Sequence, residues 1–293
     1  MSESTRQGTL NVVASPIGNL SDVSRRALDV LRAADIVIAE DTRHSRKLLA
    51  HFGIQRRLMS MHRFSEASKV DRLIDRLREG LDLALLTDGG TPTISDPGHR
   101  LVRAALEAGI AVVPIPGPSA VTAALSVSGL PADRFLFAGF LPSRAQARRR
   151  ALRGLAAALE TIVLFEAPHR LLASLADLEE VLGDREAVLC RELTKRHEEI
   201  LRGPVSDLRE RLAARDGVRG EIVLVLAPSE SGAAAGSPAD ERLRGAYRDA
   251  LAAEEGDARR ALRRLSRELG VPRADLKRKL DLMIQSAREG RER

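Results

Sequence analysis

Short apolar runs that each end in a loop of Gly, Pro, Asp or Ser are the feature that most constrains how this chain folds. The clearest run is Leu83–Leu86, and it is followed by Thr87–Gly98, a loop dense in carboxylates, hydroxyls and glycines. Four consecutive apolar residues fit a strand that is buried on both faces. The loop is compatible with a ligand site or with a plain turn, because Gly, Pro, Asp and Thr are ordinary turn residues.

Runs of the same kind alternate with helical patterns through the first half of the chain. We expect strands over residues 9–14, 36–39, 83–86 and 111–115, with helices over 23–34, 48–52, 70–78 and 99–108. This alternation predicts a parallel sheet with right-handed crossovers. Parallel strands place their carboxyl ends at one edge of the sheet, so the loops after Ala14, Ala39, Leu86 and Ile115 are expected to converge on a ligand site.

The second half repeats the alternation after a break at residues 129–133. We expect strands over residues 135–140, 161–165, 187–193 and 221–227, with helices over 143–159, 169–181 and 205–214. The predicted organisation is an N-terminal α/β domain at 9–130 and a second α/β domain at 131–228. A frayed N-terminus at 1–8, a flexible linker at 229–238 and a helical basic tail at 239–293 complete the chain.

Positive charge is concentrated in the tail. Residues 258–293 carry twelve Lys/Arg against five Asp/Glu, whereas the whole chain of 293 residues has a net charge of +6. The apolar positions of the tail fit two short amphipathic helices around a turn at Gly270–Arg273. Clustered cations bind phosphate backbones, although a solvated helix face is the more frequent arrangement, and both interpretations stay open.

Several classes of protein are disfavoured by what the sequence lacks. The single cysteine, Cys190, excludes an intrachain disulfide and fits a reducing compartment, so we expect a cytoplasmic protein in which this thiol is buried and inert. A phosphate-binding P-loop, a dinucleotide glycine motif and a nucleophile elbow are missing. The six histidines show no ligand spacing, and no metal is expected.

Six motifs occur in an order that matches one family. They are Ser15–Leu20 with Arg25–Ala27, Glu40–Arg43, Asp88–Gly98, Pro114–Ala120, Phe165–Arg170 and Arg191–Lys195. Over about residues 9–228 these motifs resemble the bacterial small-subunit ribosomal RNA methyltransferase I family, which is part of the tetrapyrrole methylase superfamily. The resemblance implies two α/β domains of the tetrapyrrole methylase type with a cofactor cleft between them, a small C-terminal helical domain, and a homodimer.

The same resemblance implies an activity. It is the S-adenosylmethionine-dependent 2′-O-methylation of a cytidine ribose in the decoding region of 16S rRNA, either as naked RNA or within the small ribosomal subunit. Two alternatives remain open. One is a methyltransferase that acts on a small tetrapyrrole or corrinoid, and the other is a ribosome assembly factor without catalytic activity.

The residues implied to bind the cofactor come from the loops that are expected to converge and from the second domain. They are Pro16, Asp88, Gly89, Gly90, Thr91, Pro92, Ser119, Ala120, Phe165, Ala167 and Ala227. Gly89 stands where the family usually has Ala, and Ala227 stands where it usually has an acidic residue or Gly. Asp96 is explained equally well by a role at a helix N-terminus.

A ribose hydroxyl is a poor nucleophile, so its reaction calls for a base or a polarising cation. Glu166 and Lys195 are the candidate catalytic residues, and an ordinary ion pair is the competing interpretation of each. RNA contact is expected from basic residues near the converging loops and in the tail, namely Arg43, Arg46, Lys47, His62, Arg63, Arg170, Arg263 and Lys277.

Overall fold

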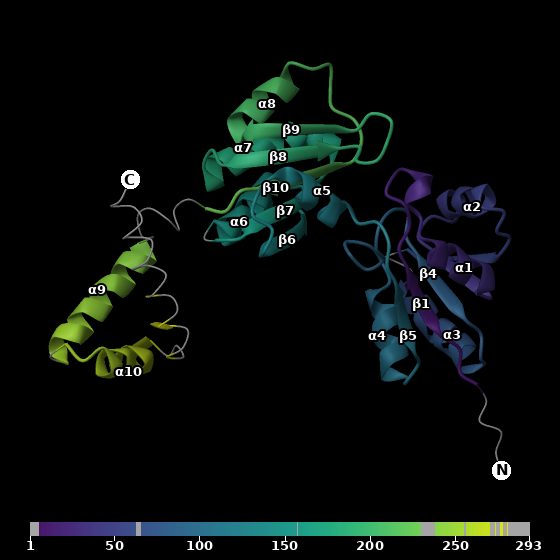
Figure 1. Ribbon diagram of the computed structural model, residues 1–293, viewed down its shortest axis with the longest axis horizontal. Helices are drawn as coiled ribbons and strands as arrows, with labels where there is room; N and C mark the ends of the chain where they lie inside the picture. The colour runs from purple at the N-terminus through teal and green to yellow at the C-terminus, as the bar shows by residue number, and fades with distance from the viewer. Residues whose placement is uncertain are drawn as a thin grey trace, which may run out of the picture.

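The computed structural model describes residues 6–62, 66–156, 158–229, 238–254 and 256–269, together with Arg273, Leu276, Lys277 and Leu280. Within these residues the chain forms two five-stranded sheets with helices packed on them, and a pair of helices near the C-terminus (Figure 1). The predicted fold class, two α/β units followed by a helical unit, is confirmed.

The first sheet is parallel throughout and has the strand order β3-β2-β4-β1-β5. Its elements are β1 (Leu10–Val13), α1 (Arg25–Ala33), β2 (Ile36–Ala39), α2 (Thr42–His51), β3 (Arg57–Ser60), α3 (Glu66–Arg78), β4 (Leu83–Leu86), α4 (His99–Glu107) and β5 (Val112–Ile115). Four of the strands are those predicted. The edge strand β3 was missed because it begins with Arg57 and ends with Ser60, so the sequence has no continuous apolar run there.

Helices cover both faces of this sheet. Apolar residues of α3 and α4 pack against one face, and those of α1 and α2 pack against the other. Along the strand order, the connection from β1 runs past β4 to β2, whereas the connection from β4 runs in the opposite direction, past β1 to β5. The neighbouring carboxyl ends of β1 and β4 therefore form the topological switch point, where open α/β sheets bind their ligands.

The second sheet is mixed, with the strand order β6-β7-β10-β8-β9. Its elements are β6 (Phe135–Phe140), α6 (Ala145–Leu155), β7 (Thr161–Glu166), a 3₁₀ turn (Pro168–Arg170), α7 (Leu171–Leu182), β8 (Glu186–Arg191), β9 (Glu199–Pro204), α8 (Val205–Ala213) and β10 (Ile222–Leu226). Strand β10 runs antiparallel to both β7 and β8, and β9 runs antiparallel to β8. The edge strand β9 was not predicted.

Helix α5 (Ala120–Ser128) follows the first sheet in the chain but packs on the second one. Its residues Val121, Ala124 and Leu125 share a core with the strands β7, β8 and β10, while α6, α7 and α8 cover the opposite face of that sheet (Figure 1). Ile17, from the loop after β1, also joins this core. The two sheets are thus linked by apolar packing as well as by the chain itself.

The tail contains α9 (Pro238–Ala253) and α10 (Ala258–Leu269), which pack against each other. Leu243, Leu265, Leu276 and Leu280 form their small core. The turn predicted at Gly270–Arg273 falls mostly outside the described residues. In the part of the chain that the structure describes, no helix has the length and apolar character needed to span a membrane.

Candidate functional site

The loops after β1 and β4 are bound to each other through their backbones. The Ser15 N–H donates to the Gly90 carbonyl at 2.9 Å, and the Gly90 N–H donates to the Ser15 carbonyl at 3.0 Å. The buried Ser15 hydroxyl donates to the Thr87 carbonyl at 2.9 Å. Gly90 has φ +88°, a conformation that favours glycine. This pairing fixes the position of both loops at the switch point.

The loops after β2 and β5 reach the same place. The Asp41 N–H donates to Asp88 Oδ1 at 3.3 Å, which connects the β2 loop to the β4 loop. A Cβ atom at Gly90 would lie 3.9 Å from the Pro118 carbonyl oxygen, so the β5 loop also lies beside it. Partial burial raises the pKa of the Asp88 carboxyl above its ordinary value. The four loops that were expected to converge therefore do meet, around a half-buried carboxylate.

The rest of the central loop is held in an unusual backbone conformation. Thr93 and Ser95 have φ values of +74° and +66°, which are uncommon for residues other than glycine, and strain of this kind clusters at functional sites. The Thr87 hydroxyl donates to Asp96 Oδ2 at 2.6 Å, which ties the two ends of the loop together. Asp96 therefore braces the loop.

The helix N-terminus beside Asp96 is capped by a residue that the sequence did not indicate. Glu66 Oε1 accepts hydrogen bonds from the N–H groups of Gly98, Arg100 and Leu101 at 2.8–3.3 Å. Glu66 lies at the start of α3, about thirty residues away in the chain, and is buried. A long-range cap of this kind leaves no local sequence signal, because capping motifs are read only within four residues of the helix start.

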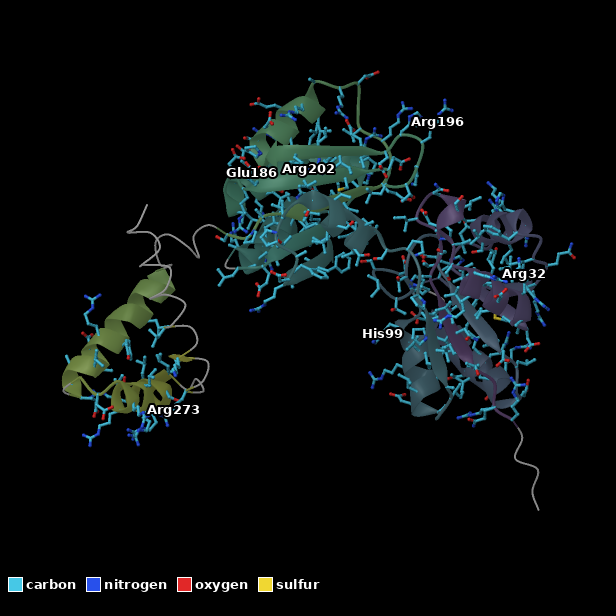
Figure 2. All side chains as sticks on the ribbon, in the orientation of Figure 1. Arg32, His99, Glu186, Arg196, Arg202 and Arg273 are labelled. Carbon is cyan, nitrogen blue, oxygen red and sulfur yellow. The ribbon has the colours of Figure 1, made fainter. Side chains whose placement is uncertain are left out.

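The loop that follows β8 brings the second domain against the first. The Asn19 N–H donates to Thr194 Oγ1 at 3.0 Å. A Cβ atom at Gly18 would lie 2.4 Å from Lys195 Cγ, so glycine is needed for this approach. Figure 2 shows Arg196 on this loop, at the end of the second domain that faces the first. The loop that carries Lys195 therefore lies against the loop after β1, which carries Pro16.

Phe165 and Ala167 lie at this end of the second sheet. Phe165 is the residue before the end of β7, next to β6, and its ring packs against Phe137 and Phe140 with centroid distances of 4.9 and 5.4 Å. Ala167 is held by a hydrogen bond from its N–H to Glu166 Oε1 at 2.7 Å. The side chain of Phe140 is 55% exposed, so this aromatic group is open to solvent.

Ala227 does not join these residues, which corrects the expectation that the end of the last strand contributes to the site. Because β10 is antiparallel, its first residue Ile222 pairs with Glu166, and its last residue Leu226 pairs with Ile162 at the start of β7. Ala227 therefore lies at the opposite edge of the second sheet, where its N–H donates to the Glu186 carbonyl at 2.8 Å.

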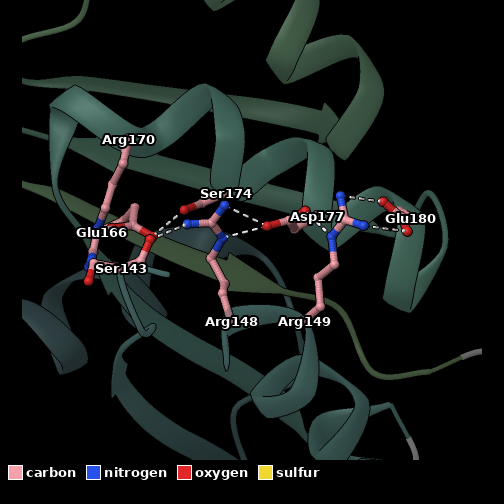
Figure 3. A network of polar contacts seen from close by, with 8 residues as sticks. All are labelled: Ser143, Arg148, Arg149, Glu166, Arg170, Ser174, Asp177 and Glu180. Atoms are coloured by element: carbon pink, nitrogen blue, oxygen red, sulfur yellow. Dashed lines mark hydrogen bonds and ion pairs between the residues drawn. The ribbon is translucent and has the colours of Figure 1, made fainter. Parts of the chain in front are cut away.

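Glu166 is buried within the second domain and fully engaged there. Its Oε1 accepts hydrogen bonds from Arg170 Nε at 2.5 Å and from the Ala167 N–H, and its Oε2 accepts one from the Ser174 hydroxyl at 2.5 Å (Figure 3). The ion-pair interpretation therefore describes Glu166 and Arg170. The pair holds the turn that carries Ala167, which is a positioning role.

Lys195 is also paired, but it remains partly exposed. Its Nζ lies 3.0 Å from Glu192 Oε1 and 3.1 Å from Glu221 Oε2. Partial burial lowers the pKa of the ammonium, but the two hydrogen bonds outweigh this effect, and the pKa is raised above its ordinary value. A raised pKa keeps this lysine a cation at neutral pH.

The basic residues predicted to contact RNA lie in three places. Arg43, Arg46 and Lys47 are exposed on α2, and the exposed His62 follows β3. Arg263 and Lys277 are exposed in the tail. Arg170 is the exception, since it is mostly buried against Glu166. Arg63 lies outside the described residues.

Comparison with known proteins shows the family to which the chain belongs. Residues 9–209 match the model of the family described as Tetrapyrrole (Corrin/Porphyrin) Methylases. The chain belongs to this family. Tetrapyrrole methylases are methyltransferases, and the expectation of an enzyme of this class is confirmed.

Relatives with similar sequences within the tetrapyrrole methylases share one name, ribosomal RNA small subunit methyltransferase I. The protein of Xylella fastidiosa is 52% identical over 221 residues, which cover 75% of this chain and 81% of the relative. The protein of Micromonospora olivasterospora is 45% identical over 267 residues, which cover 91% and 84% of the two chains. The resemblance noted in the six motifs is thereby confirmed.

Solved structures of other proteins share the fold. The uroporphyrin-III-C-methyltransferase of Thermus thermophilus has a TM-score of 0.55 and 25% identity, and the alignment covers 75% of this chain and 94% of that one. A diphthine synthase has a TM-score of 0.58 at 20% identity over 75% and 90% of the two chains. The family model ends before α9 and α10, so these tail helices lie outside the part that defines the family.

Proposed function

We propose that the chain transfers a methyl group from S-adenosylmethionine to the 2′-oxygen of a cytidine ribose in the decoding region of 16S rRNA. The observation that carries the proposal is the identity of about 50% with ribosomal RNA small subunit methyltransferases I over three quarters of the chain. The exposed cations of α2 and α10 also favour a polyanionic substrate over a small tetrapyrrole.

The proposed cofactor site uses the residues that meet between the two domains. Pro16, Asp88, Gly89, Gly90, Thr91, Pro92, Ser119 and Ala120 would contribute from the first domain and its β5 loop, and Phe165 and Ala167 from the second. Methyl transfer from a sulfonium is an in-line displacement, in which positioning of the two reactants supplies much of the acceleration. The hydrogen-bonded pairing of Ser15 with Gly90 suits this task, because it holds the backbone near the cofactor in one arrangement.

The proposed contribution of Lys195 is electrostatic. An ammonium beside the reacting ribose would stabilise negative charge that develops on the 2′-oxygen as its proton leaves. The raised pKa of Lys195 supports this cationic role. Glu166 would act on the reaction through the turn that it holds, together with Arg170.

The remaining basic residues would contact the RNA. Arg43, Arg46, Lys47, His62 and Arg63 belong to the first domain, and Arg263 and Lys277 to the tail. A second copy of the chain would pack on β6, one of the two edge strands of the second sheet. Phe135, Leu136 and Phe140 expose 43%, 39% and 55% of their surface there, which supports a homodimer.

The test is a methyl-transfer assay with labelled S-adenosylmethionine and three acceptors: small ribosomal subunits, naked 16S rRNA and a tetrapyrrole. Transfer to either RNA acceptor supports the proposal, and transfer to the tetrapyrrole alone replaces it with small-molecule methylation. A calorimetric titration with the cofactor accompanies the assay. The absence of measurable affinity would favour a non-catalytic assembly factor.

A further inference from the structure

The outward face of α2 carries only cations and uncharged groups. Arg43, Arg46 and Lys47 are exposed, whereas Leu48 and Leu49 are buried against the first sheet. At 3.6 residues per turn, the three cations fall on one face of the helix. Residues 42–51 include no acidic side chain, so nothing within the helix neutralises this face.

The side chains of these cations form no ion pair with a carboxylate of the described residues, although the Asp41 carboxylate at the N-cap of the helix accepts a hydrogen bond from the Arg43 N–H at 2.7 Å. Some other exposed arginines of the same domain do have one, whereas Arg25, Arg72 and Arg100 have none among the described residues. Arg78 pairs with Asp75 at 3.5 Å, and Arg103 pairs with Glu107 at 2.8 Å. What sets the α2 face apart is that three such cations lie together on a helix without an acidic residue, whereas an ordinary solvated helix face alternates charges of both signs.

A pocket of about 620 Å³ continues the α2 face at the C-terminal end of the helix. Arg46 links the two, since it belongs to the helix and lines the pocket. The other lining residues include the apolar Leu49 and Ile54, the polar Gln55, the cations Arg56 and Arg57, and the carboxylate Asp35. The acidic one, Asp35, already accepts a hydrogen bond from the Asp82 N–H at 2.8 Å. Arg56 and Arg57 are exposed, so the pocket is a basic recess with an apolar floor.

We infer that the α2 face and this pocket bind the sugar–phosphate backbone of the RNA substrate, an inference that rests on the proposed function. The ten residues of α2 span about 15 Å. The helix begins beside Asp88 at the site edge of the sheet and ends at the pocket, so the cations form a track that leads away from the proposed reaction site. The three cations of α2 occupy about 6 Å of this length, and Arg56 and Arg57 at the pocket extend the row beyond the helix, so the surface matches successive phosphates better than a single small anion.

Arg56 and Arg57 are new members of this surface. Arg56 directly precedes the edge strand β3 and Arg57 is its first residue, and both lie outside the motifs that carry the family resemblance. The Arg56 guanidinium donates one hydrogen bond to the Arg32 carbonyl, and its remaining N–H groups, like those of Arg57, suit phosphate oxygens. In this arrangement the phosphate contacts set the position of the RNA on the enzyme and do not select its sequence.

The first experiment compares two variants that lose the same number of charges. Arg46→Gln/Arg57→Gln removes two cations of the proposed surface, and Arg78→Gln/Arg103→Gln removes two paired arginines from the same domain. For the first variant we expect the KM for small subunits to rise about tenfold. We also expect the slope of log K for RNA binding against log salt to become shallower by between about 1 and 2. Cofactor affinity should not change, and the control variant should match the wild type in all three quantities.

The second experiment maps the contact directly. The only cysteine, Cys190, is buried, and burial raises the pKa of its thiol to about 11, so a cysteine introduced on the surface can be labelled selectively. A photoreactive group on Gln55→Cys should crosslink to 16S rRNA in small subunits. The same group on Glu107→Cys, on the exposed side of α4, should not.

The outcomes distinguish a failure of this inference from a failure of the proposed function. If the wild type methylates RNA but Arg46→Gln/Arg57→Gln behaves like its control, the inference is overturned. Crosslinking that is equal from both cysteine positions also overturns it. If the wild type transfers no methyl group to RNA, the proposed function fails, while the crosslink still decides whether this surface binds RNA.

Discussion

The Asn19 N–H donates to Thr194 Oγ1 at 3.0 Å, across 175 positions of the chain. This bond joins the loop after the first strand of one domain to the loop after β8 of the other. Thr194 has φ +63°, and the neighbouring Glu192 has φ +52°, so the second loop holds a strained conformation where it meets the first domain. The contact decides how the two halves of the proposed cofactor site face each other.

A methyl group at Gly18 should disrupt this contact. The added Cβ would lie 2.4 Å from Lys195 Cγ, 2.8 Å from Thr194 Oγ1 and 3.0 Å from the Leu193 carbonyl oxygen, and the backbone oxygen cannot move aside easily. We expect Gly18→Ala to weaken cofactor binding about tenfold and to lower the free energy of unfolding by about 1–3 kcal/mol. Calorimetric titration and urea unfolding measure the two effects.

Gly89→Ala is the matched control, and it restores the residue usual in the family. Here the added Cβ would lie 3.6 Å from the Pro16 carbonyl oxygen and 3.7 Å from Ile17 Cα, which are ordinary contacts. Cofactor affinity should stay within about twofold of the wild type or increase slightly. A large loss would mean that the loop adopts another conformation when the cofactor is bound.

A second prediction concerns the buried ion pair between Arg148 and Asp177. Arg148 lies 2.6 Å from Asp177 Oδ2, and both side chains are nearly inaccessible (Figure 3). Asp177→Ala leaves a buried guanidinium without its partner and should cost about 3–5 kcal/mol in urea unfolding. Arg148→Met/Asp177→Leu removes both charges and should recover most of this loss. A cost below about 1 kcal/mol for Asp177→Ala would contradict the burial of the pair.

Lowering the pH should destabilise the second domain, because the Glu199 carboxylate becomes protonated. Hydrogen bonds from Arg215, and further from Arg191, lower the pKa of this carboxyl to about 2 despite its partial burial. Because the pKa of Glu199 is lower in the folded than in the unfolded chain, its ionised carboxylate stabilises the fold above about pH 4.5. This contribution is lost as the pH falls toward 2. Glu199→Gln should therefore lower the free energy of unfolding by about 2 kcal/mol at pH 7 and by less at pH 3. A difference that is the same at both pH values would show that the charge is not responsible.

The role of Lys195 is tested by kinetics with the cofactor held at saturation. Lys195→Ala should reduce kcat about 100-fold while the Kd for S-adenosylmethionine stays within about threefold, and Lys195→Arg should restore part of the rate because it keeps the positive charge. Glu166→Gln should weaken the hold on the turn at Ala167 and so change cofactor affinity as well as rate. Near-normal turnover in both Lys195→Ala and Glu166→Gln would remove both residues from the reaction.

The sequence predicted most of the fold because the central strands carry continuous apolar runs, as in Leu83–Leu86. The strands β3 and β9 were missed because both are edge strands with mixed polarity. The direction of β10 was not predictable, since an apolar run has the same pattern in a parallel or an antiparallel strand, and this direction is what moved Ala227 away from the site. The contacts of Glu66 and Thr194 depend on residues far apart in the chain, which no local pattern records.

The most direct test of the central claim is to locate the methyl group. Small ribosomal subunits that lack the modification are incubated with the chain and labelled S-adenosylmethionine, and fragments of the 16S rRNA are analysed by mass spectrometry. The proposal predicts one methyl group per subunit, on the 2′-oxygen of a cytidine in the decoding region. A methyl group on a base, a methyl group elsewhere in the RNA, or no transfer to the RNA would contradict it.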